Sequence, residues 1–312
     1  MVSVRYQVRH VTRYRYGTPV SAGYNVAFLT PRSTLTQVVE RTDLTIDPGP
    51  HERYSHLDVF GNEATYWSMT RPHDDVTITA TSVVRLDATG MLPRADDIGW
   101  EATVRALDVG RSAELLAARP FRVSSPLVPS IAGLREFAAQ SFAPGRTLED
   151  ALVDLNHRIF AGFEFDADFS EVSTPLSEVL AHRRGVCQDF AHLMVGAVRS
   201  VGLAARYVSG YIETEPPPGV EKLVGTDASH AWCSVFVPGA GWLELDPTND
   251  AVRPDRHVVV AWGRDYSDVA PVRGVVFGPP SAQRLDVGVD VQRLDDAGGA
   301  PTDHTSASSR TS

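Results

Sequence analysis

The chain has 312 residues, 43% of them hydrophobic, and a formal net charge of −10. This length can bury one large core or two ordinary ones. The negative charge argues against nucleic acid or an anionic membrane surface as a partner, and no apolar run approaches the roughly 20 residues that span a bilayer.

The first segment, Met1 to Arg9, alternates between apolar and polar residues and lacks the apolar core of a signal peptide. We therefore expect a cytoplasmic protein. Only two cysteines are present, Cys187 and Cys233. Two cysteines argue against a disulfide framework, and a reducing compartment keeps a catalytic thiol usable.

Short alternating segments separated by turn signals fill the first 90 residues. Residues 2–8 and 76–84 show the clearest alternation, and Pro48-Gly49-Pro50 closes another apolar segment. This pattern predicts an antiparallel β-sandwich domain over residues 1–90. We expect the sandwich to be a scaffold that packs on the rest of the chain. A role in substrate docking stays open.

Helical signals dominate the middle of the chain. We expect residues 91–125 to be a connecting segment with one short helix. Ile131, Leu134 and Phe137 predict a helix that ends by Pro144. Thr147 is expected to cap the next helix, and Thr174-Pro175 to begin a third.

The segment from Arg184 to Met194 carries the main chemical signal. Apolar residues recur at helical spacing from Phe190, and Gly185 breaks regular structure before them, so we predict a helix that begins near Val186. Cys187 then lies in the first turn. There the helix dipole and unpaired backbone N–H groups favour a thiolate and can receive an oxyanion. Asp189 is expected to be an acidic first-turn residue that complements the dipole.

Two predicted strands downstream supply a base and an orienting group for this cysteine. His230 lies on the predicted strand 229–237, and Asp246 lies on the predicted strand 241–248. Asp246 reaches His230 only if the two residues share a face of the sheet. That requires an odd number of loop residues, for instance the three residues 238–240. His230 and Asp246 are then diagonal neighbours, roughly 7–8 Å apart.

Four sequence blocks resemble the bacterial transglutaminase-like family of the papain-like superfamily. They are Gly-Val-Cys-Gln-Asp-Phe-Ala-His (185–192), Ala-Arg-Tyr-Val-Ser-Gly-Tyr (205–211), Asp-Ala-Ser-His-Ala-Trp (227–232) and Trp-Leu-Glu-Leu-Asp-Pro-Thr (242–248). The resemblance implies that Cys187 is the nucleophile, His230 the base and Asp246 the orienting residue. The segments around Tyr14, Thr30 and Phe60 are similar to the N-terminal region that accompanies the catalytic domain of this family.

The expected fold class is therefore α+β. An N-terminal antiparallel β-sandwich precedes a papain-like or transglutaminase-like core in which helices are followed by an antiparallel sheet. The catalytic domain is expected over residues 126–294, with segments 257–262, 274–277 and 285–291 completing its sheet. The loop 213–227 is expected either to wall the cleft or to be a surface excursion. Residues 295–312 are expected to be disordered.

Competing roles for the polar residues are weaker. Cys233 lies off the parity of His230 and is expected in the core. A zinc site built from Cys187, His192, His230 and Cys233 is disfavoured, because these residues face different sides of their elements. Glu244 shares a face with Asp246 and competes with it as the orienting residue. His182 and His257 have no evident partner and are expected at the surface or at a helix end.

The predicted function is cysteine-dependent acyl transfer on amide or peptide bonds through a thioester. We expect a peptidase or amidase with a peptide or protein substrate and no cofactor, since no segment has the spacing of a calcium-binding EF-hand loop. Two alternatives are a true transglutaminase, with an amine as acceptor, and a binding module that keeps the fold without catalysis. The oligomeric state cannot be predicted from this sequence.

Overall fold

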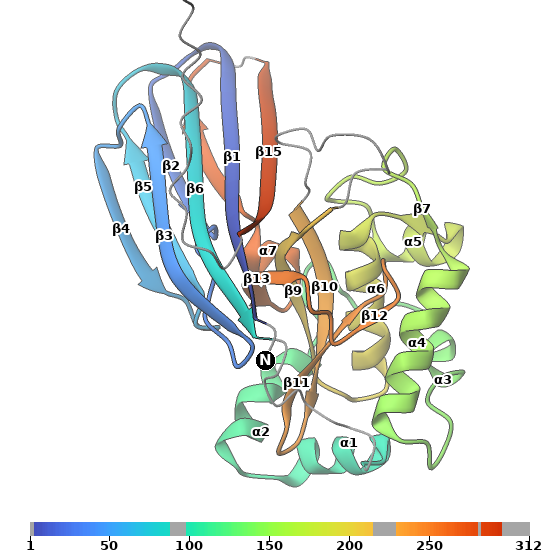
Figure 1. Ribbon diagram of the computed structural model, residues 1–312. Coiled ribbons are helices and arrows are strands. Elements are labelled where there is room, and N and C mark those ends of the chain that lie inside the picture. Colours follow the sequence, from blue (N-terminus) through green and yellow to red (C-terminus); the bar gives the residue numbers. More distant parts are fainter. Residues whose placement is uncertain (1–2, 88–97, 215–228, 280–281, 295–312) are drawn as a thin grey trace, which may run out of the picture.

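A computed structural model describes residues 3–87, 98–214, 229–279 and 282–294. It shows a mixed α+β chain, which confirms the expected fold class. A β-sandwich lies on one side and a group of helices lies on the other. A separate five-stranded sheet, called the central sheet below, lies between them (Figure 1). The predicted disordered tail and most of the loop 213–227 lie outside the described residues.

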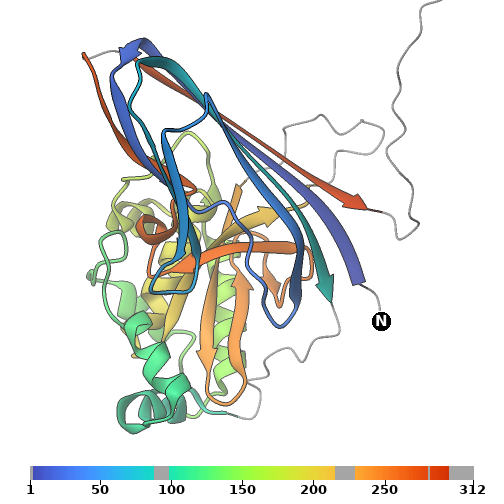
Figure 2. The same cartoon turned by 90° about the vertical axis from the view of Figure 1, so that its left-hand side faces the viewer.

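The sandwich consists of two four-stranded sheets, with strand orders β15-β1-β6-β3 and β14-β2-β5-β4. Its long strands run side by side in Figure 2. Alternate residues such as Ile78 and Trp67 are fully buried between the sheets, as the period-two pattern predicts. The strands from the first part of the chain are β1 (Ser3–Val20), β2 (Ala22–Ala27), β3 (Gln37–Asp47), β4 (Glu52–Leu57), β5 (Glu63–Met69) and β6 (His73–Asp87).

The last two strands correct a prediction. β14 (Val272–Phe277) and β15 (Gln283–Leu294) do not complete the catalytic sheet; they pair with β2 and β1 of the sandwich. β1 is 18 residues long, and β6 pairs with one of its edges. β15 pairs with the other edge, which would otherwise expose a long row of unpaired backbone groups. The end of the expected catalytic domain, up to residue 294, therefore packs with the first domain.

The connecting segment contains more structure than expected. Two α-helices and a 3-10 turn lie within residues 100–122, where one short helix was predicted. They are α1 (Trp100–Val109), α2 (Ala113–Ala118) and η1 (Arg119–Arg122). The buried residues Leu107, Leu115 and Phe121 contribute to a small separate core that includes Phe236 of the central sheet. This segment is thus packed against the central sheet.

Four further helices lie between this segment and the central sheet: α3 (Leu134–Ala139), α4 (Leu148–Gly162), α5 (Leu176–His182) and α6 (Cys187–Ser200). Thr147 caps α4 as predicted, because its side chain accepts a hydrogen bond from the backbone N–H of Asp150. α6 is the most buried helix, and 11 of its 14 residues are buried. Two short segments, β7 (Glu164–Phe165) and β8 (Arg184–Gly185), pair in parallel just before α6.

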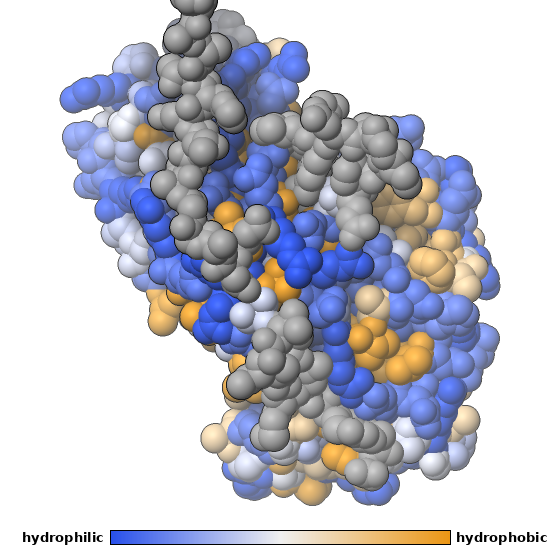
Figure 3. Space-filling view, viewed as in Figure 1, coloured by the Kyte–Doolittle hydropathy of each residue, from blue (hydrophilic) through white to orange (hydrophobic). Residues whose placement is uncertain are grey.

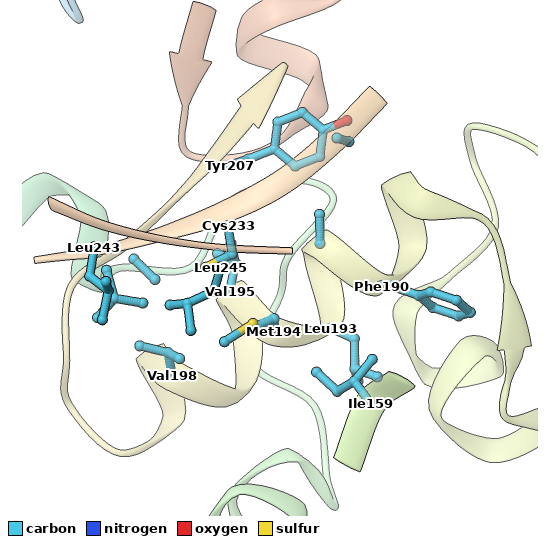
Figure 4. Packing of buried hydrophobic residues seen from close by; sticks show 14 of the residues in the cluster. Ile159, Phe190, Leu193, Met194, Val195, Val198, Tyr207, Cys233, Leu243 and Leu245 are labelled. Carbon is cyan, nitrogen blue, oxygen red and sulfur yellow. The ribbon is translucent and has the colours of Figure 1, made fainter. Parts of the chain in front are cut away.

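The central sheet has the strand order β12-β11-β10-β9-β13. Its members are β9 (Ala205–Ile212), β10 (Ser229–Val237), β11 (Gly241–Asp246), β12 (Ala251–Val252) and β13 (His257–Gly263), and the short helix α7 (Tyr266–Val269) follows. One face of the sheet packs on α6. Figure 4 shows Met194 and Val195 of α6 beside Cys233 and Leu245 of the sheet, whereas Leu193 lies beside Ile159 of α4. This packing fixes the start of α6 relative to β10 and β11.

The outer surface is largely hydrophilic in the view of Figure 3, where hydrophobic residues form separate small patches. Among the residues that the structure describes, no helix has the length and apolar character needed to cross a bilayer.

Candidate active site at the start of helix α6

Cys187 is the first residue of α6, as the glycine break before it predicts. Cys187 is partly exposed, and the backbone N–H groups of the first turn have no partners within the helix. Asp189 lies in the same turn and is buried. Its Oδ2 accepts hydrogen bonds from the backbone N–H of Val186 at 2.8 Å and from Oγ of Ser170 at 2.5 Å. Asp189 therefore holds the chain at the residue before Cys187, in addition to its dipole role; the family resemblance also implies a supporting structural role for it.

Gly185 allows this close packing. A Cβ atom at Gly185 would lie 2.7 Å from Oδ2 and 2.8 Å from Cβ of Asp189, which is shorter than side-chain contacts allow. The same residue pairs with Phe165 in the parallel bridge between β7 and β8. The glycine is therefore required by the contact with Asp189 as well as by the start of the helix.

The register between β10 and β11 confirms the predicted geometry. Val237 pairs with Gly241, which leaves the three-residue loop 238–240. Cys233 lies opposite Leu245, so continuing the register places Asp246 opposite Trp232 and diagonal to His230. Nε2 of His230 is 2.7 Å from Oδ2 of Asp246.

Asp246 is completely buried and accepts hydrogen bonds on both oxygens. Oδ1 accepts from the backbone N–H groups of Thr248 and Asn249, at 2.9 and 3.3 Å. Oδ2 accepts from the amide of Asn249 at 2.7 Å in addition to His230. Burial alone would raise the pKa of Asp246, but the donating histidines outweigh it and hold the pKa well below its usual range. Asp246 is thus an ionised carboxylate at neutral pH.

His230 also contacts Cys187. Burial lowers the pKa of His230, but hydrogen bonds with Asp246 and with Cys187, together with their charges, raise it to about 10. Nε2 is occupied by Asp246, so Nδ1 is the ring nitrogen that remains for the thiol. The ring is 7% exposed and stacks on Trp232, with the ring centroids 5.9 Å apart. The three residues singled out from the sequence therefore form one continuous chain of contacts.

The competing candidates lie elsewhere. Cys233 is fully buried in the core, and burial raises the pKa of its thiol to about 12. Nε2 of His192 accepts a hydrogen bond from the backbone N–H of Tyr266. Glu244 accepts a hydrogen bond from the indole of Trp232 at 3.3 Å. His182 is exposed at the end of α5.

His257 was expected at the surface, and that prediction is wrong. It is 7% exposed, and its Nε2 is 2.7 Å from Oδ2 of Asp246. Its position at the start of β13 gives no local signal for this contact, because β13 is three strands away from β11 in the sheet. The only hint in the sequence of a contact between His257 and Asp246 is that a carboxylate ends one strand and a histidine begins a later strand.

The ligand atoms of His230, Asp246 and His257 lie within 4.8 Å of one another, so these residues are the described group with the spacing to hold a metal ion. The Nε2 atoms of the two histidines each lie at hydrogen-bonding distance, 2.7 Å, from Oδ2 of Asp246. Together, a partly exposed thiol, a basic imidazole and an ionised carboxylate have the composition needed for nucleophilic catalysis, and the first turn of α6 provides N–H groups that can stabilise an oxyanion.

Known proteins resemble this chain along most of its length. Residues 6–85 match the bacterial transglutaminase-like N-terminal region, and residues 135–247 match the transglutaminase-like superfamily. An uncharacterized protein of Mycobacterium tuberculosis is 42% identical over 296 residues, which cover 92% of each chain. One of Mycobacterium leprae is 32% identical over 290 residues, covering 93% of this chain and 99% of the relative.

A shorter match links the chain to a protein-glutamine gamma-glutamyltransferase of Pseudomonas aeruginosa, at 40% identity over 75 residues, which cover 24% of this chain and 11% of that one. Among solved structures, a protein of Cytophaga hutchinsonii described as a candidate cysteine protease superposes with a TM-score of 0.73 at 18% identity, covering 96% of this chain and 93% of its own. That likeness extends over both the sandwich and the catalytic half. The matched regions, the full-length relatives and the shared fold show that this chain belongs to the bacterial transglutaminase-like family.

Proposed function

We propose that the protein is a cysteine-dependent acyl-transfer enzyme that cleaves amide bonds of a peptide or protein through a thioester, with water as the second substrate. The observation that supports this proposal is the chain of contacts from Cys187 through His230 to Asp246. Each group has the partner that its role requires: the nucleophile has a base, and the base has a buried anion that orients it.

In the first half of the proposed reaction, the sulfur of Cys187 attacks the amide carbonyl carbon. The electron pair of the C=O bond moves onto oxygen, and backbone N–H groups at the start of α6 stabilise the negative charge. When the C–N bond breaks, His230 donates its proton to the nitrogen, so an amine leaves and the acyl group stays on sulfur. Asp246 keeps the ring of His230 in place and stabilises the imidazolium.

In the second half, His230 takes a proton from water while the water oxygen attacks the thioester. The C–S bond then breaks with its electron pair on sulfur, which releases a carboxylic acid and restores the thiolate–imidazolium pair. We favour water as the acceptor because Cys187 is partly exposed. The Cytophaga hutchinsonii protein of the same fold is described as a candidate cysteine protease, which agrees with hydrolysis.

A second candidate is transglutamination, in which a primary amine replaces water. The local similarity to a protein-glutamine gamma-glutamyltransferase favours it. Both candidates share the thioester and the three residues, so they differ only in the acceptor that reaches the acyl-enzyme. Incubation with a glutamine-containing peptide and a fluorescent primary amine separates them. Incorporation of the amine supports the transferase, whereas release of ammonia without incorporation supports the hydrolase.

The proposal is tested without knowledge of the substrate by alkylation with a small excess of iodoacetamide at pH 7. We expect fast, stoichiometric labelling of Cys187, while Cys233 stays unlabelled because it is buried and its thiol has a raised pKa. The rate should fall at least about tenfold in His230→Ala, since the thiolate loses its paired imidazolium. Cys233→Ser is the matched control and should label like the wild type. Slow labelling of both cysteines at similar rates would refute the enzymatic proposal.

A further inference from the structure

Two histidines share one oxygen of Asp246. Nε2 of His230 and Nε2 of His257 each lie 2.7 Å from Oδ2. Their ring centroids are 5.3 Å apart and the rings are inclined by 64°. Because Asp246 is ionised and can only accept hydrogen bonds, both Nε2 atoms must carry a hydrogen.

The two imidazoles differ in what lies at their other nitrogen. The second nitrogen of His230 faces Cys187, which explains why this ring can hold a second proton. Nδ1 of His257 is buried and has no hydrogen-bond partner among the residues that the structure describes. A proton on Nδ1 would leave an unpaired N–H group in the interior, which is unfavourable. His257 is therefore the neutral ring with its hydrogen on Nε2, in agreement with a pKa that burial lowers.

The ring of His257 is held on several sides. Trp232 meets it edge to face, with the ring centroids 4.9 Å apart at 89°. The backbone of His257 pairs with Ile212 of β9. Gly210 of β9 lies next to Trp232: a Cβ atom at Gly210 would approach Cη2 of Trp232 to 2.6 Å. The glycine thus lets the indole lie across β9 and support the histidine.

The donors to Asp246 have different origins, and this difference sets the role of His257. Thr248 and Asn249 belong to the turn that follows Asp246, so they move with it. His230 is the group that the carboxylate orients. His257 comes from β13, at the other end of the sheet. Among the described residues, it is therefore the donor to Asp246 that comes from neither the turn nor the base.

We infer that His257 is a positioning residue of the catalytic site: its neutral Nε2–H group anchors Oδ2 of Asp246 to β13, so that the carboxylate faces His230. This inference deepens the proposed function and depends on it. The charged and titratable groups around His257 are Asp246, His230 and Asp255, and Asp87, Glu244 and Arg253 line the adjoining cavity of about 50 Å³.

Positioning and simple electrostatics predict opposite effects of removing the donor. If His257 only withdrew negative charge from Asp246, His257→Leu would make the carboxylate more attractive to a proton on His230 and would raise the pKa of His230. If His257 positions Asp246, the freed carboxylate turns away from His230 and the pKa of His230 falls. An opposite charge within a few ångströms shifts a pKa by about 1–3 units, so we expect a fall of about one unit or more.

The experiment uses the full chain labelled with ¹⁵N-histidine, with the pH titration of the His230 ring nitrogens followed by NMR and assigned through His230→Gln. In His257→Leu the titration midpoint should fall, and alkylation of Cys187 by iodoacetamide at pH 7 should slow at least about tenfold. In His257→Gln, whose side-chain amide donates a hydrogen from nearly the same position, both values should return close to those of the wild type. An unchanged or raised midpoint in His257→Leu would overturn the inference.

Controls separate the possible failures. His182→Leu changes an exposed histidine and should leave both readouts unchanged. If His257→Leu does not fold, His257→Phe keeps an aromatic ring against Trp232 without a hydrogen to donate, and the same fall in midpoint is expected from it. Slow alkylation of Cys187 in the wild type would refute the proposed function. Fast alkylation in the wild type and in every folded His257 variant would refute only the role of His257.

Discussion

The side-chain amide of Gln37 pairs with both backbone groups of Val259, as a neighbouring strand would. Nε2 donates to the carbonyl oxygen at 2.7 Å, and Oε1 accepts from the backbone N–H at 2.9 Å. Asn62 repeats the arrangement at Trp262, with distances of 2.8 and 3.0 Å. Two amides of the sandwich therefore satisfy the outer edge of β13, the strand that begins with His257. This contact agrees with the expectation that the sandwich is a scaffold for the catalytic half.

Gln37→Met should lower the thermal unfolding midpoint and speed hydrogen exchange at the amide of Val259. The substitution keeps the length of the side chain but leaves two buried backbone groups without their main partner, at a cost of about 1–3 kcal/mol each. Gln140→Met is the matched control, because Gln140 is exposed and both of its side-chain hydrogen bonds lie at the surface: it donates to the carbonyl oxygen of Glu136 at 3.5 Å and accepts from Arg158 at 2.9 Å. Equal exchange at Val259 in both variants would contradict the pairing.

Gly210→Ala should prevent stable folding of the central sheet. A Cβ atom there would lie 2.0 Å from the backbone oxygen of Val258 and 2.6 Å from Trp232, and a backbone atom cannot move aside as a flexible side chain can. We expect a loss well above the roughly 1–3 kcal/mol of ordinary overpacking. Gly49→Ala, where no atom lies within 4 Å of the added methyl group, should leave the circular dichroism spectrum and the unfolding midpoint unchanged.

The position of Cys187 at a helix start and the diagonal placement of Asp246 and His230 are predictable from sequence because each depends on a short-range rule, whereas the approach of Cys187 to His230 was expected only from the resemblance to the family. A glycine break places Cys187 at the start of a helix. Strand parity and a three-residue loop place Asp246 diagonal to His230. The core position of Cys233 follows from the same parity. These rules act within a few residues or across one hairpin, so no knowledge of the overall fold is needed.

The position of His257 and the pairing of β14 and β15 cannot be predicted in that way. His257 meets Asp246 only because the sheet brings its two ends together, across β9 and β10. β15 has a regular alternating pattern, but such a pattern does not state which free edge it will join. Its partner β1 is more than 260 residues away along the chain, as the pairing of Arg5 with Leu294 illustrates. Both features depend on long-range packing.

Gly185→Ala should damage the start of α6 more than the rest of the fold. The added methyl group would collide with Asp189, whose carboxylate holds the residue before Cys187. We expect a loss of about 1–3 kcal/mol in stability and slower alkylation of Cys187. The control is Gly162→Ala at the end of α4, where the nearest atom is the mobile Nη1 of Arg183 at 3.7 Å. Alkylation at the wild-type rate in Gly185→Ala would show that Asp189 does not set the position of the thiol.

The ion pair between His230 and Asp246 should make stability depend on pH. The pKa of His230 rises from 6.5 to about 10 on folding. A histidine with a raised pKa contributes stability that is fully present below pH 6.5 and is lost as the pH rises through the folded value. Asp246 behaves in the opposite way: its pKa is lowered from 3.8, so its contribution is present above pH 3.8 and is lost on acidification below that value.

Cys187→Ala and the double variant Cys187→Ala/Asp246→Asn isolate this effect, because both lack the thiol that contacts His230. In Cys187→Ala, His230 keeps its carboxylate partner. The free energy of unfolding should therefore fall between pH 6.5 and 9, with a slope of at most about 1.4 kcal/mol per pH unit for one proton. In the double variant the carboxylate is absent and burial lowers the pKa of His230, so the curve should not fall over this range and should rise slightly near pH 6.5, where the unfolded chain still holds the proton. Urea unfolding at several pH values measures both curves, and parallel curves would mean that Asp246 does not hold the proton of His230 in the folded protein.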